Sequence, residues 1–292
     1  EHITSSCFFF FFLIVRRPPR LTQSRSSAAS DVYKRQGANS APSLIGETIQ
    51  NARLFWARTL AEPDEAAFLE RLPGQRVEAI SRRAKFLVLT LSQWVLVTHL
   101  RMSGDLRVLH SDASPDFHDR MALDFCSGWR LSFNDPRKFG RIWLVPDTKQ
   151  LFASLGPEPD DPALTPQTLH AMLQQKKRQI KPLLLDQHFI AGLGNIYTDE
   201  ALFTAGIHPL RTSESLDLRE AEKLLAAIRL TLRNGIEANG ASFDWVYRGG
   251  SFQNHFQVYQ KTNSPCPCCA LPIQKTMVGQ RGTHFCPNCQ PL

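Results

Sequence analysis

Four cysteines near the end of the sequence constrain its folding more than any other feature. Cys266 and Cys269 form one Cys-x2-Cys pair, and Cys286 and Cys289 form a second pair after sixteen intervening residues. Each pair supplies two thiolates from one tight turn, and structural Zn2+ binds four thiolates tetrahedrally. The spacing therefore predicts one structural zinc ion held by these four residues. Cys268 breaks the spacing and is left open as an alternative ligand.

The residues between the two cysteine pairs favour a β-hairpin. Residues 273–278 and 283–285 are suited to short strands, and residues 279–282 to the turn between them, with Arg281 at its tip. This predicts a zinc ribbon. The prediction does not extend to function, because ribbons of this kind serve many different partners.

The charge of the chain gives only weak support for an acidic partner. The 292 residues carry a formal net charge of +7, but only +3 of it belongs to residues beyond 1–36. Local basic runs are more informative, and one of them joins residues 176–178 with Lys181. Basic clusters are compatible with nucleic acid, although a single run is more often a solvated face. Seven cysteines, of which four have metal-type spacing, favour a reducing cytoplasm over a secreted disulfide framework.

Residues 1–36 differ from the rest of the sequence. Their apolar run, residues 8–15, is too short to span a bilayer, and its arginines follow the run instead of preceding it as in a signal peptide. We expect this segment to be a non-native or disordered tail, and nothing in the sequence suggests a membrane protein or an oligomer.

The remaining chain divides into a strand-rich part, a helical part and the ribbon. Strands are expected at residues 86–91, 94–100, 121–125, 129–133 and 142–145, with a helix at 65–72. After a proline-rich linker, helices are expected at residues 165–175, 180–186, 196–205 and 218–239, the third capped by Asn195. The predicted fold is α+β: a β-sandwich over 37–155, a helical domain over 156–245 and a zinc-ribbon hairpin over 246–292.

Six motifs occur in an order that identifies a family. They are RRAKFL from Arg82, HLRMSG from His99, NDPRKFG from Asn134, LGPEP from Leu155, GLGNIYTDE from Gly192 and GQRGTHFC from Gly279. With the cysteine pairs, they make residues 44–292 resemble the bacterial formamidopyrimidine-DNA glycosylases. The resemblance implies a helix–two-turn–helix in the helical domain. It also implies a repair enzyme that removes oxidised purines from double-stranded DNA and cleaves the strand as a lyase, in the bacterial cytoplasm and as a monomer.

The resemblance also implies roles for individual residues. Met102, Arg137 and Phe139 match the side chains that fill the gap left by a flipped nucleotide, and their types suit wedging and pairing with the orphaned base. The matching DNA contacts are His118, Lys176 and Asn195, the last at a glycine-rich helix start that suits a phosphate. Arg281 matches the finger arginine beside the lesion, and Lys85 a lysine needed near it. Taken singly, Met102 fits a core residue better and His118 an ordinary surface residue better, and the alternative for Lys85 is an ordinary exposed lysine at the start of a strand.

One departure from the family pattern concerns the catalytic nucleophile. The family begins with Pro-Glu, whose secondary amine attacks the sugar, and that pair should lie about sixteen residues before Leu44. Residues 28–43 contain no Pro-Glu, and the pair occurs only at Pro157-Glu158. We therefore expect the chain as printed to bind lesions without cleaving them. The alternative function is a non-catalytic protein that binds lesions or abasic sites. A sister enzyme for oxidised pyrimidines fits the LGPEP and GTHFC stretches less well.

Overall fold

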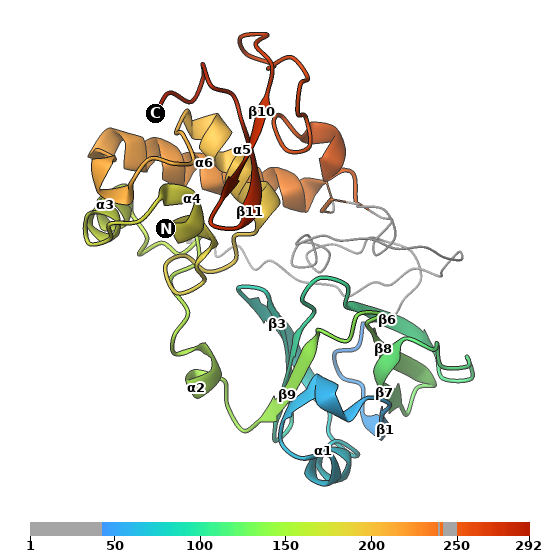
Figure 1. Ribbon diagram of the computed structural model, residues 1–292. Coiled ribbons are helices and arrows are strands. Elements are labelled where there is room, and N and C mark those ends of the chain that lie inside the picture. Colours follow the sequence, from blue (N-terminus) through green and yellow to red (C-terminus); the bar gives the residue numbers. More distant parts are fainter. Residues whose placement is uncertain (1–42, 239, 242–249) are drawn as a thin grey trace, which may run out of the picture.

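The computed structural model describes residues 43–238, 240–241 and 250–292. The expectations for residues 1–36, and for the Pro-Glu position, fall outside these ranges. Two lobes are visible, a sheet lobe and a helical lobe that carries the C-terminal hairpin, and a linker that contains α2 (Lys149–Phe152) joins them (Figure 1).

Two sheets pack face to face in the sheet lobe. One has four antiparallel strands in the order β1 (Ile49–Leu54), β7 (Asp119–Phe125), β8 (Trp129–Asn134) and β6 (Asp105–His110). The other has five, in the order β2 (Leu60–Glu62), β9 (Arg141–Val145), β5 (Val95–His99), β4 (Phe86–Leu91) and β3 (Val77–Arg83). Side chains from both sheets and from α1 (Glu65–Arg71) share one core, in which Phe68, Leu96 and Phe133 are fully buried. The expected sandwich is confirmed.

The registers of the two sheets bring several loops to one end of the sandwich. In the five-stranded sheet Phe86 pairs with His99, and His99 pairs with Arg141. In the four-stranded sheet Asn134 pairs with both Asp105 and Asp119. The turns next to these residues contain Lys85, Met102, His118, Arg137 and Phe139. Five residues that are scattered over the sequence therefore lie at the same end of the lobe.

The helical lobe is built from helices whose ends are encoded locally. Its members are α3 (Pro166–Gln174), α4 (Ile180–Leu185), α5 (Asn195–Ala205) and α6 (Leu218–Glu237). Asp217 and Glu220 form a reciprocal capping box at the start of α6, and Gly206 ends α5 with φ 70°. Their apolar faces pack into a second core. None of the helices in the described ranges is long and apolar enough to cross a membrane.

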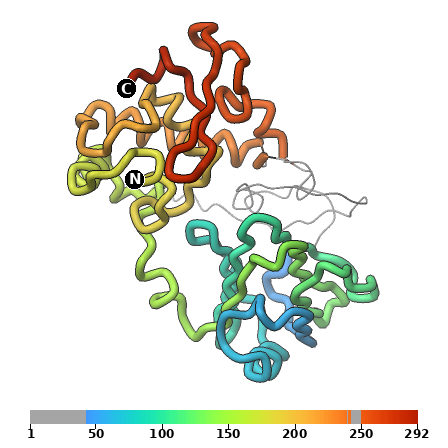
Figure 2. Tube along the Cα trace, in the orientation of Figure 1, coloured from blue at the N-terminus to red at the C-terminus, as the bar shows by residue number. Residues whose placement is uncertain are grey.

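The C-terminal hairpin lies against the helical lobe. Strands β10 (Gln274–Val278) and β11 (Arg281–Phe285) are antiparallel, and Val278 pairs with Arg281. The turn is therefore only Gly279-Gln280, with φ values of 55° and 61° that suit a tight type I′ turn. Arg281 was expected at the tip, but it is the first residue of β11. The backbone trace shows the hairpin turn directed towards the sheet lobe (Figure 2).

Candidate functional site

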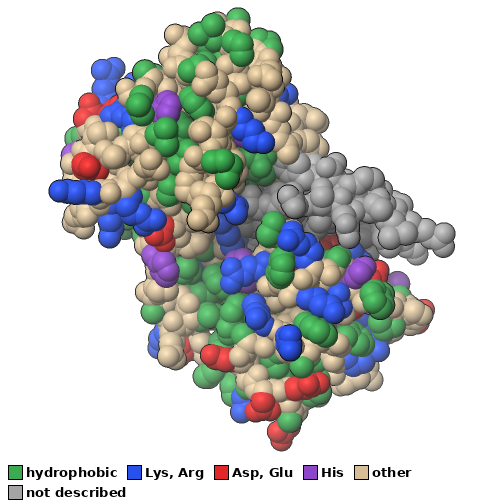
Figure 3. Space-filling view, viewed as in Figure 1, with side chains coloured by type: hydrophobic (Ala, Val, Ile, Leu, Met, Phe, Trp, Pro, Cys, Tyr) green, Lys and Arg blue, Asp and Glu red, His purple; other side chains and the backbone are tan. Residues whose placement is uncertain are grey.

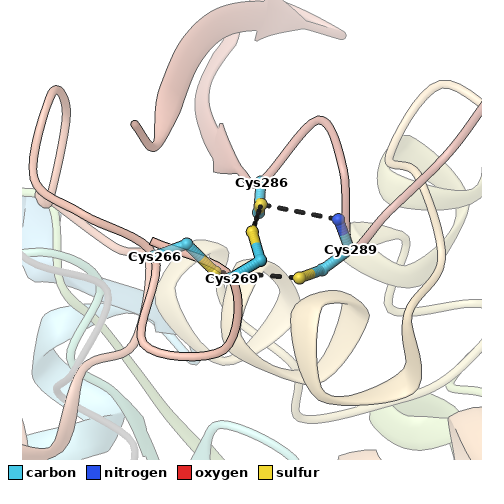
Figure 4. Close-up of side chains that lie close together, drawn as sticks. All are labelled: Cys266, Cys269, Cys286 and Cys289. Atoms are coloured by element: carbon cyan, nitrogen blue, oxygen red, sulfur yellow. Dashed lines mark hydrogen bonds between the residues drawn. The ribbon is translucent and has the colours of Figure 1, made fainter. Parts of the chain in front are cut away.

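The four predicted cysteines form a metal centre. Their sulfur atoms all lie within 4.8 Å of one another, with Cys266 and Cys289 3.8 Å apart and Cys269 and Cys286 3.5 Å apart (Figure 4). A tetrahedral zinc ion with Zn–S bonds of about 2.3 Å separates its sulfurs by about 3.8 Å, so the cluster fits one Zn2+. The exposed Cys268 is not part of this group, but its backbone N–H donates to the Cys266 sulfur at 3.4 Å.

A buried ion pair fastens the hairpin to the helices. The Nζ of Lys181 on α4 lies 2.6 Å from Oδ1 of Asp199 on α5, and both side chains are 0% exposed. Lys181 also donates to the Gly282 carbonyl at 2.9 Å and the Thr283 hydroxyl at 2.7 Å, and Asp199 accepts from His284 N–H at 3.0 Å. Burial lowers the pKa of Lys181, the nearby Arg281 lowers it further, and Asp199 opposes both effects.

Two expectations for this region were wrong in detail. Lys181 was grouped with the basic residues at 176–178, but the hairpin covers it completely. Its buried partner is Asp199 on α5. Asn195 was expected to cap α5, but Gly194 is the cap residue. The Asn195 amide instead donates to the Gly282 carbonyl at 3.1 Å, next to Arg281.

The predicted wedge residues contact one another at the end of the sandwich. A guanidinium nitrogen of Arg137 lies 3.8 Å from the Met102 sulfur, and the guanidinium carbon lies 4.7 Å from the centre of the Phe139 ring. Phe139 is 49% exposed, so its ring is open to solvent on one side. A half-buried methionine, an exposed phenylalanine and an exposed arginine from two separate turns therefore form one group of contacting side chains.

Positive charge surrounds this group. Exposed Arg101, Lys138 and Arg141 lie beside the wedge residues, and Figure 3 shows Lys and Arg side chains gathered on the sheet lobe where it faces the helical lobe. Burial, together with the charges of Arg101 and Lys85, lowers the pKa of His99 to about 3. The neutral His99 therefore accepts the Arg101 N–H at 3.0 Å and adds no charge of its own.

His118 and Lys176 lie in different surroundings. His118 is half-buried at the same end of the sandwich, with its Nδ1 3.5 Å from a guanidinium nitrogen of Arg120. Lys176 is exposed on the helical lobe, where it lines a shallow pocket with Arg178, Asp186 and His188. That pocket contains none of the other predicted site residues.

A clamp that was not predicted holds the turn that carries Lys85. Glu158, in the linker between the lobes, pairs with Arg82 at 2.5 Å and Arg83 at 3.1 Å, and accepts the Ala84 N–H at 2.7 Å. Two of the sequence motifs, RRAKFL and LGPEP, are therefore complementary parts of one contact. Burial opposes ionisation of Glu158, but Arg82 and the Ala84 N–H outweigh it and lower its pKa.

Removing the charge of Glu158 is expected to have a pH-dependent effect. Because its pKa is lower in the folded state, its contribution to stability is present above the unfolded value and is lost as pH falls through the folded value. We expect Glu158→Gln to lower the free energy of unfolding by about 1–3 kcal/mol near neutral pH. The difference should shrink as pH falls below 4.5, the ordinary value of a glutamate carboxyl, and through the lower pKa of the folded state. Urea unfolding over this pH range measures it, and a deficit that does not change with pH would contradict it.

Comparisons with known proteins agree with this geometry. Three family models match: the formamidopyrimidine-DNA glycosylase N-terminal domain at residues 35–142, its H2TH domain at 155–245, and a zinc finger found in FPG and IleRS at 263–292. The formamidopyrimidine-DNA glycosylase of Chloroflexus aurantiacus is 46% identical over 261 residues, which cover 86% of this chain and 92% of that protein. One from Bacillus cereus is 41% identical over 257 residues, which cover 85% and 93%.

Solved structures are similar over the same range. Lactococcus lactis Fpg in complex with DNA that contains an abasic site has a TM-score of 0.79 and 33% identity, over 85% of this chain and 94% of that chain. The wild-type Lactococcus lactis enzyme with DNA containing N7-benzyl-Fapy-dG has a TM-score of 0.80 and 34% identity, with the same coverage. With all three family models matched in order, the chain belongs to the formamidopyrimidine-DNA glycosylase family.

Proposed function

We propose that the protein is a base-excision repair glycosylase and lyase that removes oxidised purines, namely 8-oxoguanine and formamidopyrimidines, from double-stranded DNA. The observation that carries the proposal is the contact between Met102, Arg137 and Phe139 on an exposed, positively charged end of the sandwich. The relatives named as glycosylases, and those solved with damaged DNA, support it. We expect the protein to act as a monomer in the bacterial cytoplasm, where the nucleoid lies.

The wedge gives the protein a way to hold DNA with one nucleotide turned out. A base inside a duplex is inaccessible, so the enzyme must extrude it and fill the vacated space. The thioether of Met102 and the ring of Phe139 are apolar groups that can enter the stack. Arg137, in contact with both, brings hydrogen-bond donors to the base left without a partner.

A second set of residues is proposed to hold the phosphates around the lesion. The N-terminus of α5, with Asn195 in its first turn, suits an anion because backbone N–H groups and the positive end of the helix dipole point outwards there. Arg281 lies beside this helix end because both Lys181 and Asn195 donate hydrogen bonds to the carbonyl of the next residue, Gly282. Lys85 and His118 at the sandwich end, and Lys176 on the helical lobe, supply further contacts to the backbone. The zinc supplies no chemistry of its own, because four thiolates fill its coordination shell and make it structural.

The chemical step needs an amine that attacks C1′ of the flipped nucleotide. The attack forms a bond between the amine nitrogen and C1′ and expels the damaged base. The bond between C1′ and the ring oxygen of the sugar then breaks, which leaves an iminium. The iminium drives elimination of the 3′ phosphate. In this chain the corresponding segment, residues 28–43, has no Pro-Glu pair. The proposed glycosylase and lyase needs the Pro-Glu pair that the chain as printed lacks, and without that pair the chain is expected to behave as the alternative function does, as a lesion-binding protein without catalysis.

Borohydride trapping on an 8-oxoguanine duplex separates the two functions. Borohydride reduces an iminium between protein and sugar to a stable covalent bond, so an adduct reports the nucleophile directly. For the chain as printed we expect preferential binding to the lesion duplex without an adduct. A trapped adduct would show instead that this chain is itself catalytic, and peptide mapping would identify its amine. Failure to prefer the lesion duplex would contradict both functions.

A further inference from the structure

The two turns that carry the wedge residues share one buried carboxylate. Asp135 is 0% exposed, and its Oδ1 accepts a hydrogen bond from the Ser103 hydroxyl at 2.5 Å. The same carboxylate accepts the Arg137 N–H at 3.2 Å and the Gly140 N–H at 2.7 Å. Ser103 directly follows Met102, and Arg137 and Gly140 enclose Phe139. Asp135 thus joins the Met102 turn to the Arg137–Phe139 turn from beneath.

Both turns have an unfavourable backbone conformation at the equivalent place. Arg101 has φ 59° and Lys138 has φ 60°, and each immediately precedes a wedge residue, Met102 in one turn and Phe139 in the other. Left-handed backbone is disfavoured for residues with a Cβ and persists only where the surrounding structure enforces it. Hydrogen bonds to the shared carboxylate are the kind of constraint that can enforce it. The strain therefore indicates that the wedge geometry is held in place before any DNA arrives.

Packing adds to the same constraint. Phe133, buried on β8, lies beneath both turns: a Cβ on Gly104 would meet its ring at 2.8 Å, and one on Gly140 would meet it at 2.3 Å. The two turns therefore sit on one aromatic ring as well as on one carboxylate, and neither can shift without disturbing the other.

We propose that Asp135 and Ser103 are positioning residues that couple the two turns, so that Met102, Arg137 and Phe139 enter DNA as one preorganised unit. This inference rests on the proposed function of the wedge. A preorganised wedge does not have to be ordered during binding, so it retains more of its contact energy. Removing the hydrogen bond between Ser103 and Asp135 should weaken binding only to DNA that the wedge residues enter.

The Ser103→Ala variant cuts the link with the smallest change. It removes the hydroxyl that joins the Met102 turn to Asp135, while the Asp135 contacts with Arg137 and Gly140 remain. Ser132→Ala is the matched control, because Ser132 is equally buried on the adjacent β8 and its hydroxyl makes no hydrogen bond within the described residues. The assay measures equilibrium binding of the full chain to a duplex with a tetrahydrofuran abasic analogue, and to the undamaged duplex of the same sequence.

We expect Ser103→Ala to weaken binding to the abasic duplex about tenfold, and binding to the undamaged duplex less than about twofold. Ser132→Ala should change neither. Equal losses on both duplexes, or no loss on the abasic duplex, would overturn the coupling.

A double-mutant cycle with Met102→Ala distinguishes positioning from a purely structural role. If Ser103 acts by positioning Met102, the Met102→Ala change should cost several times less affinity in the Ser103→Ala background than in the wild type. The same fold-loss in both backgrounds would overturn the inference while leaving the wedge intact. A wild-type chain without preference for the abasic duplex would instead overturn the proposed function, and the inference with it.

Discussion

Replacing Lys181 by alanine is expected to lower the free energy of unfolding by about 3–5 kcal/mol. The change leaves the Asp199 carboxylate fully buried without the ammonium that lies 2.6 Å away. It also removes the donor to the Gly282 carbonyl and the Thr283 hydroxyl, so the hairpin loses its attachment to α4. Urea unfolding followed by circular dichroism measures the loss.

Two controls separate the buried pair from a general effect of lysine. Lys177→Ala removes an exposed lysine four residues away and should cost less than about 0.5 kcal/mol. The double variant Lys181→Met with Asp199→Asn removes both charges, while the Asn oxygen can still accept the His284 N–H. It should recover much of the loss, because the penalty comes from an unpaired buried charge. A Lys181→Ala variant as stable as Lys177→Ala would contradict this account of the hairpin.

Cys286→Ser is expected to abolish stoichiometric zinc binding and to reduce affinity for an abasic duplex by at least about hundredfold. Cys286 is fully buried, and its sulfur lies 3.5 Å from that of Cys269, at the centre of the ribbon. Without the metal, the small core of Phe203, Val258, Ile273 and the cysteines cannot hold β10 and β11 together. Arg281 then has no fixed position. Zinc content and abasic-duplex affinity, measured on the same preparation, test this.

Cys268→Ser provides the matched control for the metal centre. It changes a cysteine two residues from Cys266, but one whose sulfur lies outside the cluster of four. It should retain one zinc per chain and unchanged affinity for the abasic duplex, because only its backbone N–H contacts the centre. Loss of zinc from Cys268→Ser, or retention by Cys286→Ser, would show that the ligand set is wrong.

The parts of the structure that local sequence determines were predictable. The cysteine spacing, the β-rich runs such as residues 86–91 and the Pro166 start of α3 each follow from patterns a few residues long. Such patterns do not fix the exact ends of an element. Arg281 was expected in the turn, but it pairs with Val278 and is therefore part of β11.

The features that the sequence did not predict depend on contacts between segments far apart in the chain. Lys181 follows three basic residues and looks like a surface lysine, yet strand β11, about a hundred residues later, covers it. Glu158 lies in a proline-rich linker, where nothing nearby reveals that Arg82 and Arg83 will face it. Asp135 occurs within a recognised motif, but only the fold shows that Ser103 donates to it. In each case the side chain or backbone group that the charged residue contacts lies far away in the sequence, so the local pattern could not predict the contact.

The most direct test of the proposed DNA site is the ratio of dissociation constants for undamaged and abasic duplexes. The wild-type chain should favour the abasic duplex by at least about tenfold, because the wedge enters most readily where a base is already missing. In the double variant Met102→Ala with Phe139→Ala, this ratio should fall close to one, while affinity for undamaged DNA changes little. A double variant that keeps the wild-type ratio would contradict the central claim that these side chains recognise the damaged site.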